Sequence, residues 1–92
     1  MAESEKRPAT FPNHIEDERK LAGLTQAELA RQAGIEVTWF SRIESGRALA
    51  SPEELDQIAN ALGGVPVSRL YDTPFLRAIG AAKKATREAA AS

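Results

Sequence analysis

Apolar residues in the second half of the chain recur at helical spacing. Four of them fall at i, i+3, i+4 and i+7 and so line one face of a helix: Leu55, Ile58, Ala59 and Leu62. Ser51 and Glu54 form a capping box at its start, and Pro52 occupies the first helical position. Nowhere do apolar and polar residues alternate as they do in a half-buried strand. The pattern therefore predicts an all-α fold.

The same signals predict two helices near the start of the domain. The first is expected from residue 11 or 12 to residue 22, and Gly23 after it is a typical C-terminal stop. The second follows Thr25, which pairs with Glu28 in another capping box, and ends at Gly34. Its positions expected to be buried are Leu29, Ala30 and Ala33.

A third helix is predicted directly after a very short connection. Residues 34–36 separate it from the second helix, and it runs to about Ser45 before Gly46 ends it. Two helices joined by so short a connection are typical of a helix-turn-helix unit.

The chain divides into three segments. Residues 1–10 are expected to form a flexible lead-in, residues 11–72 a helical domain, and residues 73–92 a basic, alanine-rich helix or tail. The domain is expected to include a short fifth helix within residues 65–71. A last helix is expected over residues 74–90, because alanine favours helix and proline is tolerated at a helix start.

The third helix carries a narrow polar stripe. Successive residues of a helix are rotated by about 100° around its axis. With Thr38 as the reference, three more polar residues lie within about 60° of it: Ser41, Arg42 and Ser45. Phe40 and Ile43 point the opposite way, and Trp39 lies at the boundary. Arginine can bond guanine O6 and N7, and hydroxyls can bond either base edge. A solvated helix face explains the stripe as well, and only the short turn before the helix favours DNA recognition.

Composition and charge narrow the classes of protein. The 92 residues suffice for one small domain. A net charge of −1 argues against a strongly basic, nonspecific nucleic-acid binder. The lack of cysteine excludes a disulfide scaffold and thiolate sites. No apolar run approaches the roughly 20 residues of a membrane span, and the start lacks a secretory signal. We therefore expect a cytoplasmic protein that makes no membrane contact.

Patterns for catalysis or metal binding are missing from the sequence. His14 is the only histidine and has no cysteine or paired carboxylate at ligand spacing, so it is expected on a helix surface. Ser41 and Ser45 have no histidine or lysine base in a nucleophile arrangement, and no phosphate-binding glycine loop occurs. The sequence predicts a protein that is not an enzyme and holds no metal or cofactor.

Several short motifs follow one another over residues 15–72. They are Gly23-Leu24-Thr25-Gln26, Glu28-Leu29-Ala30, Ser41-Arg42-Ile43-Glu44-Ser45-Gly46 and Ala59-Asn60-Ala61-Leu62-Gly63. In this order they resemble the phage-repressor helix-turn-helix family, which is Xre/Cro-like or lambda-repressor-like. The resemblance implies a compact five-helix domain whose third helix reads double-stranded DNA in the major groove, here with an additional C-terminal helix.

The resemblance also implies roles for single residues. The base-reading positions are matched by Val37, Thr38, Ser41 and Arg42. Contact with the DNA phosphates is expected for Thr25, Gln26, Trp39, Ser45 and Arg47. An ion pair between the first and third helices is expected for Arg19 and Glu44. The alternative for Trp39 is packing at the edge of the core.

Two departures from the family pattern bear on DNA affinity. Val37 stands where many relatives have a glutamine that reads adenine, so only a contact with a thymine methyl is expected from it. Glu36 stands where a capping serine or threonine is common, and its carboxylate would face a polyanion.

Three roles are open for the C-terminal segment. It closes the core of its own domain, it joins a second copy, or its basic residues follow the phosphates. The dimer candidates are Val67, Leu70, Tyr71, Phe75 and Ile79. Such a dimer would place two reading helices about 34 Å apart along the DNA.

Two functions remain in contention from the sequence. The first is a repressor that binds a palindromic operator as a homodimer through residues 37–45. The alternative is an antitoxin or another protein-interaction module of the same fold, which would meet its protein partner through residues 73–92 and bind DNA only secondarily.

Overall fold

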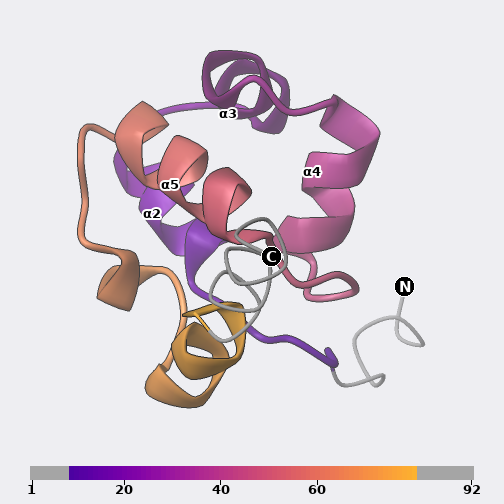
Figure 1. Ribbon diagram of the computed structural model, residues 1–92. Coiled ribbons are helices and arrows are strands. Elements are labelled where there is room, and N and C mark those ends of the chain that lie inside the picture. Colours follow the sequence, from indigo (N-terminus) through magenta and orange to yellow (C-terminus); the bar gives the residue numbers. More distant parts are fainter. Residues whose placement is uncertain (1–8, 81–92) are drawn as a thin grey trace, which may run out of the picture.

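The structure, a computed structural model, describes residues 9–80, and every regular element in this range is a helix (Figure 1). The elements are α2 (Ile15–Leu21), α3 (Gln26–Ala33), α4 (Val37–Glu44), α5 (Pro52–Ala61) and the 3-10 helix η1 (Val67–Arg69). Residues 73–80 are helical as well. The all-α prediction is confirmed. Within residues 9–80, no helix combines the length and apolar character that crossing a membrane requires.

The predicted start of the first helix was wrong. We expected it at residue 11 or 12, but α2 begins at Ile15. Two hydrogen bonds hold the preceding residues in another conformation: Phe11 N donates to the Gly46 carbonyl at 2.9 Å, and Asn13 Oδ1 accepts from Ile15 N at 2.9 Å. His14 is therefore the N-cap residue and does not lie on the helix surface.

Both predicted capping boxes are present. Thr25 Oγ1 accepts from Glu28 N at 3.1 Å, and Glu28 Oε1 accepts from Thr25 N at 2.8 Å. Ser51 and Glu54 make the same reciprocal pair at the start of α5. Each box satisfies amide groups that would otherwise lack a partner at the helix start. The sequence therefore located these two helix starts correctly.

Short apolar faces of all the helices meet in one core. The predicted faces of α3 and α5 are buried, as are the two apolar residues of α4. The largest fully buried side chains are Tyr71, Phe40, Ile15, Leu29, Ile43, Ile58 and Leu70. In Figure 1, α3 and α4 lie at one end of the domain and residues 73–80 at the other, with α5 between them. The core thus supports α4 from behind.

The C-terminal part differs from its prediction in two places. The helix expected within residues 65–71 is reduced to η1, because Gly63 and Gly64 adopt φ of 94° and 85° and Pro66 is extended with ψ of 142°. The last helix starts one residue earlier than expected, at position 73. Its predicted continuation to residue 90 lies outside the described residues, as do the tail's basic residues after position 80.

Candidate nucleic-acid interface

Helix α4 presents one face to solvent and buries the other. Phe40 and Ile43 have no exposed surface, whereas Val37 is 43% exposed and both Thr38 and Arg42 are exposed. Ser41, the fourth predicted base-reading residue, is half-buried. The predicted division of this helix into an apolar anchor and a polar front is therefore present. Such a face offers a guanidinium, hydroxyls and a methyl surface, the groups that distinguish base edges.

The connection between α3 and α4 sets the angle of this face. Gly34 ends α3 with φ of 74°, a left-handed conformation that costs other residues more. Ile35 N then donates to the Ala30 carbonyl at 2.9 Å, and the Ile35 side chain is buried at 8% exposure. The turn is thus both hydrogen-bonded and anchored in the core, so α4 cannot swing freely against α3.

Glu36 caps α4 despite being an unusual residue for that position. Its carboxylate accepts from Trp39 N at 2.9 Å. The amide groups of Trp39 and Thr38 lower the pKa of Glu36 from its ordinary value, because they stabilise the ionised form. The margin of the exposed face of α4 therefore carries a negative charge at neutral pH.

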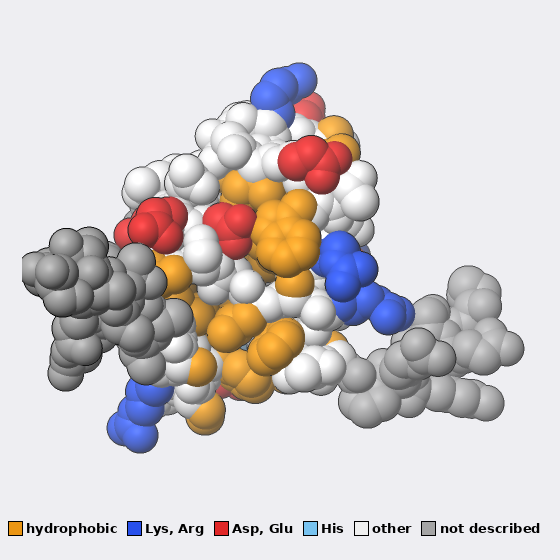
Figure 2. Space-filling model, turned by 45° about the vertical axis from the view of Figure 1, so that its right-hand side comes forward, with side chains coloured by type: hydrophobic (Ala, Val, Ile, Leu, Met, Phe, Trp, Pro, Cys, Tyr) orange, Lys and Arg blue, Asp and Glu red, His pale blue; other side chains and the backbone are white. Residues whose placement is uncertain are grey.

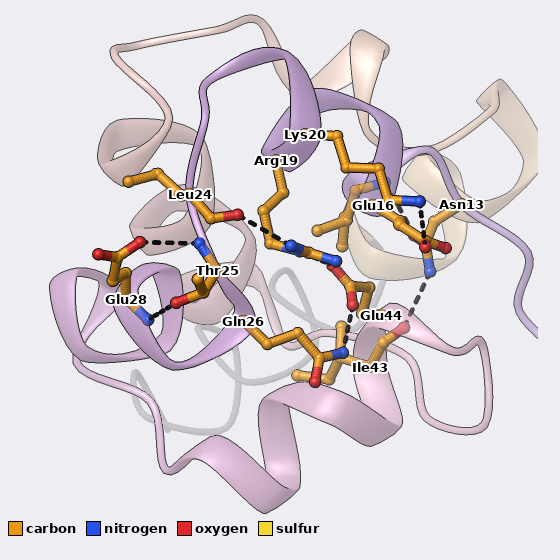
Figure 3. A network of polar contacts seen from close by, with 11 residues as sticks. Asn13, Glu16, Arg19, Lys20, Leu24, Thr25, Gln26, Glu28, Ile43 and Glu44 are labelled. Carbon is orange, nitrogen blue, oxygen red and sulfur yellow. Dashed lines mark hydrogen bonds and ion pairs between the residues drawn. The ribbon is translucent and has the colours of Figure 1, made fainter.

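An ion pair ties the C-terminal end of α4 to α2. Arg19 Nε donates to Glu44 Oε2 at 2.7 Å, and the two side chains are only 13% and 4% exposed. Arg19 Nη1 also donates to the Leu24 carbonyl at 2.9 Å (Figure 3). Arg19 and Glu44 therefore pair as expected. Their contacts hold three parts of the domain in one arrangement: α2, the turn that precedes α3, and α4.

Gln26 extends the network of the buried pair. Its side-chain Nε2 donates to Glu44 Oε1, so the amide nitrogen joins the buried pair (Figure 3). One of the two N–H groups of this amide is therefore used within the protein, and a phosphate contact through the other stays a prediction. Thr25, its neighbour, uses its hydroxyl oxygen in the α3 capping box.

Trp39 and Ser45 also engage the protein's own groups. The Trp39 indole Nε1 donates to Glu54 Oε2 of α5 at 2.8 Å, while the ring stays 39% exposed. Ser45 Oγ donates to the Arg42 carbonyl at 3.2 Å. A phosphate contact of Trp39 stays a prediction, and so does its alternative, packing at the edge of the core. Arg47 is exposed in the loop after α4, and its contact with DNA stays a prediction.

A segment before α2 supports α4, and sequence reasoning missed it. Asn13 Nδ2 donates to the Ile43 carbonyl at 2.9 Å, while its Oδ1 accepts from Ile15 N at 2.9 Å. A Cβ at Gly46 would lie 2.5 Å from Ala9 Cβ, so the segment packs tightly against this turn. An asparagine whose side chain bonds the backbone two residues on is a turn signal, and the earlier predicted helix start obscured it.

Three dimer candidates lie in the core of the single chain. Leu70 and Tyr71 have no exposed surface and Ile79 is 4% exposed, whereas Val67 and Phe75 are half-buried. Tyr71 Oη accepts from Ala50 N at 3.3 Å, and burial raises the pKa of the Tyr71 hydroxyl. Leu70, Tyr71 and Ile79 therefore close their own domain and cannot meet a second copy in this conformation.

Groups for metal or acid–base chemistry are sparse in the described part of the chain. No three His, Cys, Asp or Glu side chains of residues 9–80 are arranged to hold a metal ion. His14 Nε2 lies 3.0 Å from Asp72 Oδ1 at an exposed position. A shallow recess between α3 and α5 is lined by amide and alanine side chains: Gln32, Ala33, Gln57, Asn60 and Ala61.

The surface around α4 is mixed in character. Figure 2 turns the side of Figure 1 that carries α4 toward the viewer, and hydrophobic side chains gather at the centre of this face. Acidic side chains lie beside and above them, and basic side chains lie at the right, at the top and at the lower left of the view. This view of the described residues therefore shows no uniformly positive face of the kind that nonspecific nucleic-acid binders present.

Comparison of the sequence with known proteins finds a family and two relatives that bear on this face. Residues 14–70 match the family model of a helix-turn-helix domain. A cyanate hydratase of Synechococcus sp. (strain CC9311) is 34% identical over 56 residues, which are 61% of this chain and 37% of the relative. The cryptic phage CTXphi transcriptional repressor RstR of Vibrio cholerae serotype O1 is 40% identical over 48 residues, 52% of this chain and 43% of that repressor. The chain thus spans less than half the length of both relatives.

Proposed function

The chain belongs to the helix-turn-helix domain family, and from this premise we propose that it is a sequence-specific, DNA-binding transcriptional regulator. The observation that carries the proposal is the exposed face of α4, which is backed by the fully buried Phe40 and Ile43. In this function, α4 enters the major groove and base edges meet its exposed side chains: Val37, Thr38, Ser41 and Arg42. Similarity over 48 residues to a phage transcriptional repressor supports the same conclusion.

The regulator acts as a repressor and as a homodimer on a palindromic operator. A reading helix of eight residues spans only a few base pairs, and two copies related by a twofold axis double the number of contacts. Val67 and Phe75 retain exposed surface for contact between copies, whereas the remaining dimer candidates do not. The protein acts in the cytoplasm of a bacterium or phage host and catalyses no reaction.

Selection from a random library of DNA duplexes by the full chain at physiological salt tests this function. The expected result is an enriched inverted repeat whose half-sites lie about one helical turn, or a multiple of it, apart. The mass of the complex in solution should correspond to two chains on one duplex. Failure to enrich any motif would refute sequence-specific binding, and one chain per duplex would refute the homodimer.

A protein-interaction module of the antitoxin type is the second candidate. It is favoured by the 79% exposure of Leu21 at the end of α2 and by the carboxylates of Glu36 and Glu54 beside α4. An exposed apolar side chain and negative charges suit a protein partner better than they suit phosphates. Stoichiometric co-purification of a partner, together with DNA binding that shows no sequence preference, would favour this candidate.

A further inference from the structure

We propose that Tyr71 is a positioning residue for DNA binding: its buried hydroxyl holds the loop between α4 and α5 in the conformation from which Arg47 contacts the DNA phosphates. The inference rests on the proposed function of the chain and on the phosphate contact that we expect from Arg47. It gives a role in DNA binding to a core residue that lies outside the helix-turn-helix unit.

The loop begins with a turn that its own backbone holds. Gly46 follows the end of α4 with φ of 84°, a left-handed conformation that glycine adopts at little cost. The Arg42 carbonyl accepts from Arg47 N at 2.9 Å and from Ala48 N at 3.1 Å. Arg47 is exposed, whereas Ala48 is only 8% exposed. The backbone on both sides of Arg47 is therefore fixed, and its side chain is left at the surface.

The segment before α2 fastens the start of this loop. Phe11 N donates to the Gly46 carbonyl at 2.9 Å, and Asn13 Nδ2 donates to the Ile43 carbonyl at 2.9 Å. In Figure 1 the loop lies beside this segment. Carbonyl groups at the end of a helix lack partners within the helix, so the two bonds tie the end of α4 and the start of the loop to the rest of the domain.

Tyr71 holds the other end of the loop. Ala50 N donates to Tyr71 Oη at 3.3 Å, Tyr71 has no exposed surface, and Ala50 is 2% exposed. Leaving a buried amide group without an acceptor costs free energy. Without the hydroxyl, the loop would therefore favour conformations that expose the Ala50 amide to water. Ala50 follows Arg47 by three residues, so such a change would reach the backbone of Arg47.

A loop that is ordered before binding presents Arg47 without a further loss of conformational entropy. Ordering a mobile segment at the moment of binding reduces affinity, because its entropy is lost at that step. A phosphate contact carries no sequence information. Loss of the Tyr71 hydroxyl should therefore weaken binding to every duplex alike, and only while Arg47 is present.

A double-mutant cycle separates positioning from a general effect on the fold. Tyr71→Phe removes the hydroxyl alone, and Thr73→Val removes a hydroxyl from an exposed residue of the same segment as the matched control. Both changes are also made together with Arg47→Ala. Thermal unfolding establishes that the variants are folded. If Tyr71→Phe does not fold, Asn13→Ser, which removes the donor to the Ile43 carbonyl, tests the same loop from its other end.

The measurement is the affinity of each variant for an operator obtained by selection and for its single-base-pair variants. Tyr71→Phe should weaken binding to all of these duplexes by one common factor of about threefold to tenfold, and Thr73→Val should weaken binding to none. In the presence of Arg47→Ala, the change Tyr71→Phe should have no further effect. Arg47→Ala should also reduce the slope of log affinity against log salt concentration by about 0.9, the value for one phosphate contact.

Several outcomes would overturn the proposal, and only one of them also removes the proposed function. If Tyr71→Phe binds as tightly as the wild type, or loses the same factor with and without Arg47, Tyr71 does not position Arg47 and the proposed function stands. The same holds if Arg47→Ala leaves affinity unchanged. If the wild type enriches no motif from a random library, the proposed function fails and this inference fails with it.

Discussion

At the scale of single residues, Arg42 stands apart from its neighbours on α4. Glu36 and Ser45 bond to backbone groups of the helix itself, and Trp39 bonds to α5. The Arg42 side chain is exposed and forms no hydrogen bond or ion pair with the rest of residues 9–80. A guanidinium that is not engaged within the protein can bond a base or phosphate without first breaking another contact.

Replacing Arg42 by alanine should weaken binding to a selected operator by about 1–3 kcal/mol and relax base preference at one position. Affinities for single-base-pair variants of the operator provide the measurement. Arg31→Ala removes another exposed arginine, from α3, and should leave every base preference intact. If Arg42→Ala weakens binding to all duplexes equally, the Arg42 side chain contacts phosphates instead of a base.

The Glu36 cap makes the stability of α4 decrease at acid pH. The amide groups of Trp39 and Thr38 lower its pKa in the folded protein, so the folded state binds the proton less tightly than the unfolded state does. The stabilisation is therefore complete above about pH 4.5, the ordinary value, and is lost as the pH falls through the lowered folded pKa. Glu36→Gln should be less stable than the wild type at pH 7 and should lose less stability between pH 7 and pH 3. Urea unfolding at both values checks this, and parallel losses in the two proteins would contradict it.

At the scale of elements, the buried pair of Arg19 and Glu44 is the contact that relates the helices to one another. It joins α2 to α4, and through Gln26 it reaches the start of α3. A buried charge that loses its partner destabilises the fold more than the intact pair stabilises it. The pair therefore acts chiefly to specify one arrangement of the three helices, on which the direction of the reading face depends.

Arg19→Met should lower the free energy of unfolding by about 3 kcal/mol, because it leaves the Glu44 carboxylate buried without its cation. Lys20→Met is the matched control on the same helix. Lys20 pairs with Glu16 at 2.9 Å, but both side chains are more than half exposed, and such a pair contributes about 1 kcal/mol or less. Denaturant unfolding of both variants gives the comparison, and equal losses would show that the Arg19 pair has no special structural role.

At the scale of the whole molecule, the segment after α5 completes the domain. The Leu70 carbonyl accepts from His14 N at 2.8 Å, and Tyr71 Oη accepts from Ala50 N. The aromatic ring of Phe75 packs against Tyr71 with ring centres 6.2 Å apart and against Phe11 at 6.5 Å. The two ends of the described chain thus meet over the core, and the segment is part of the fold of one copy.

Leu70→Ala should destabilise the domain by about 2–5 kcal/mol, the range for a buried leucine, and the loss should not depend on protein concentration. Thermal unfolding followed by circular dichroism over a hundredfold range of concentration measures both. Leu21→Ala, at a position 79% exposed, should cost about 0.5 kcal/mol or less. A midpoint that rises with concentration in the wild type but not in Leu70→Ala would instead place Leu70 in a contact between copies.

The sequence by itself determined the features that depend on neighbours within one helical turn. The all-α class, both capping boxes, the stop at Gly34 and the buried faces of α3, α4 and α5 were all predictable. Each arises from hydrogen bonds or side-chain periodicity over three or four residues, and these are written in the local order of residues. Family motifs added the pairing of Arg19 with Glu44.

Only the tertiary structure decided the features that depend on distant partners. Asn13 and Phe11 leave the helix pattern because they bond to Ile43 and Gly46, about thirty residues away. Gln26 turns its side-chain nitrogen inward because the Glu44 carboxylate lies beside it. Leu70 and Tyr71 face their own core because the chain returns over α2. Side chains of this kind can bond outward or inward equally well, and their partner is fixed by which segments the folded chain brings together.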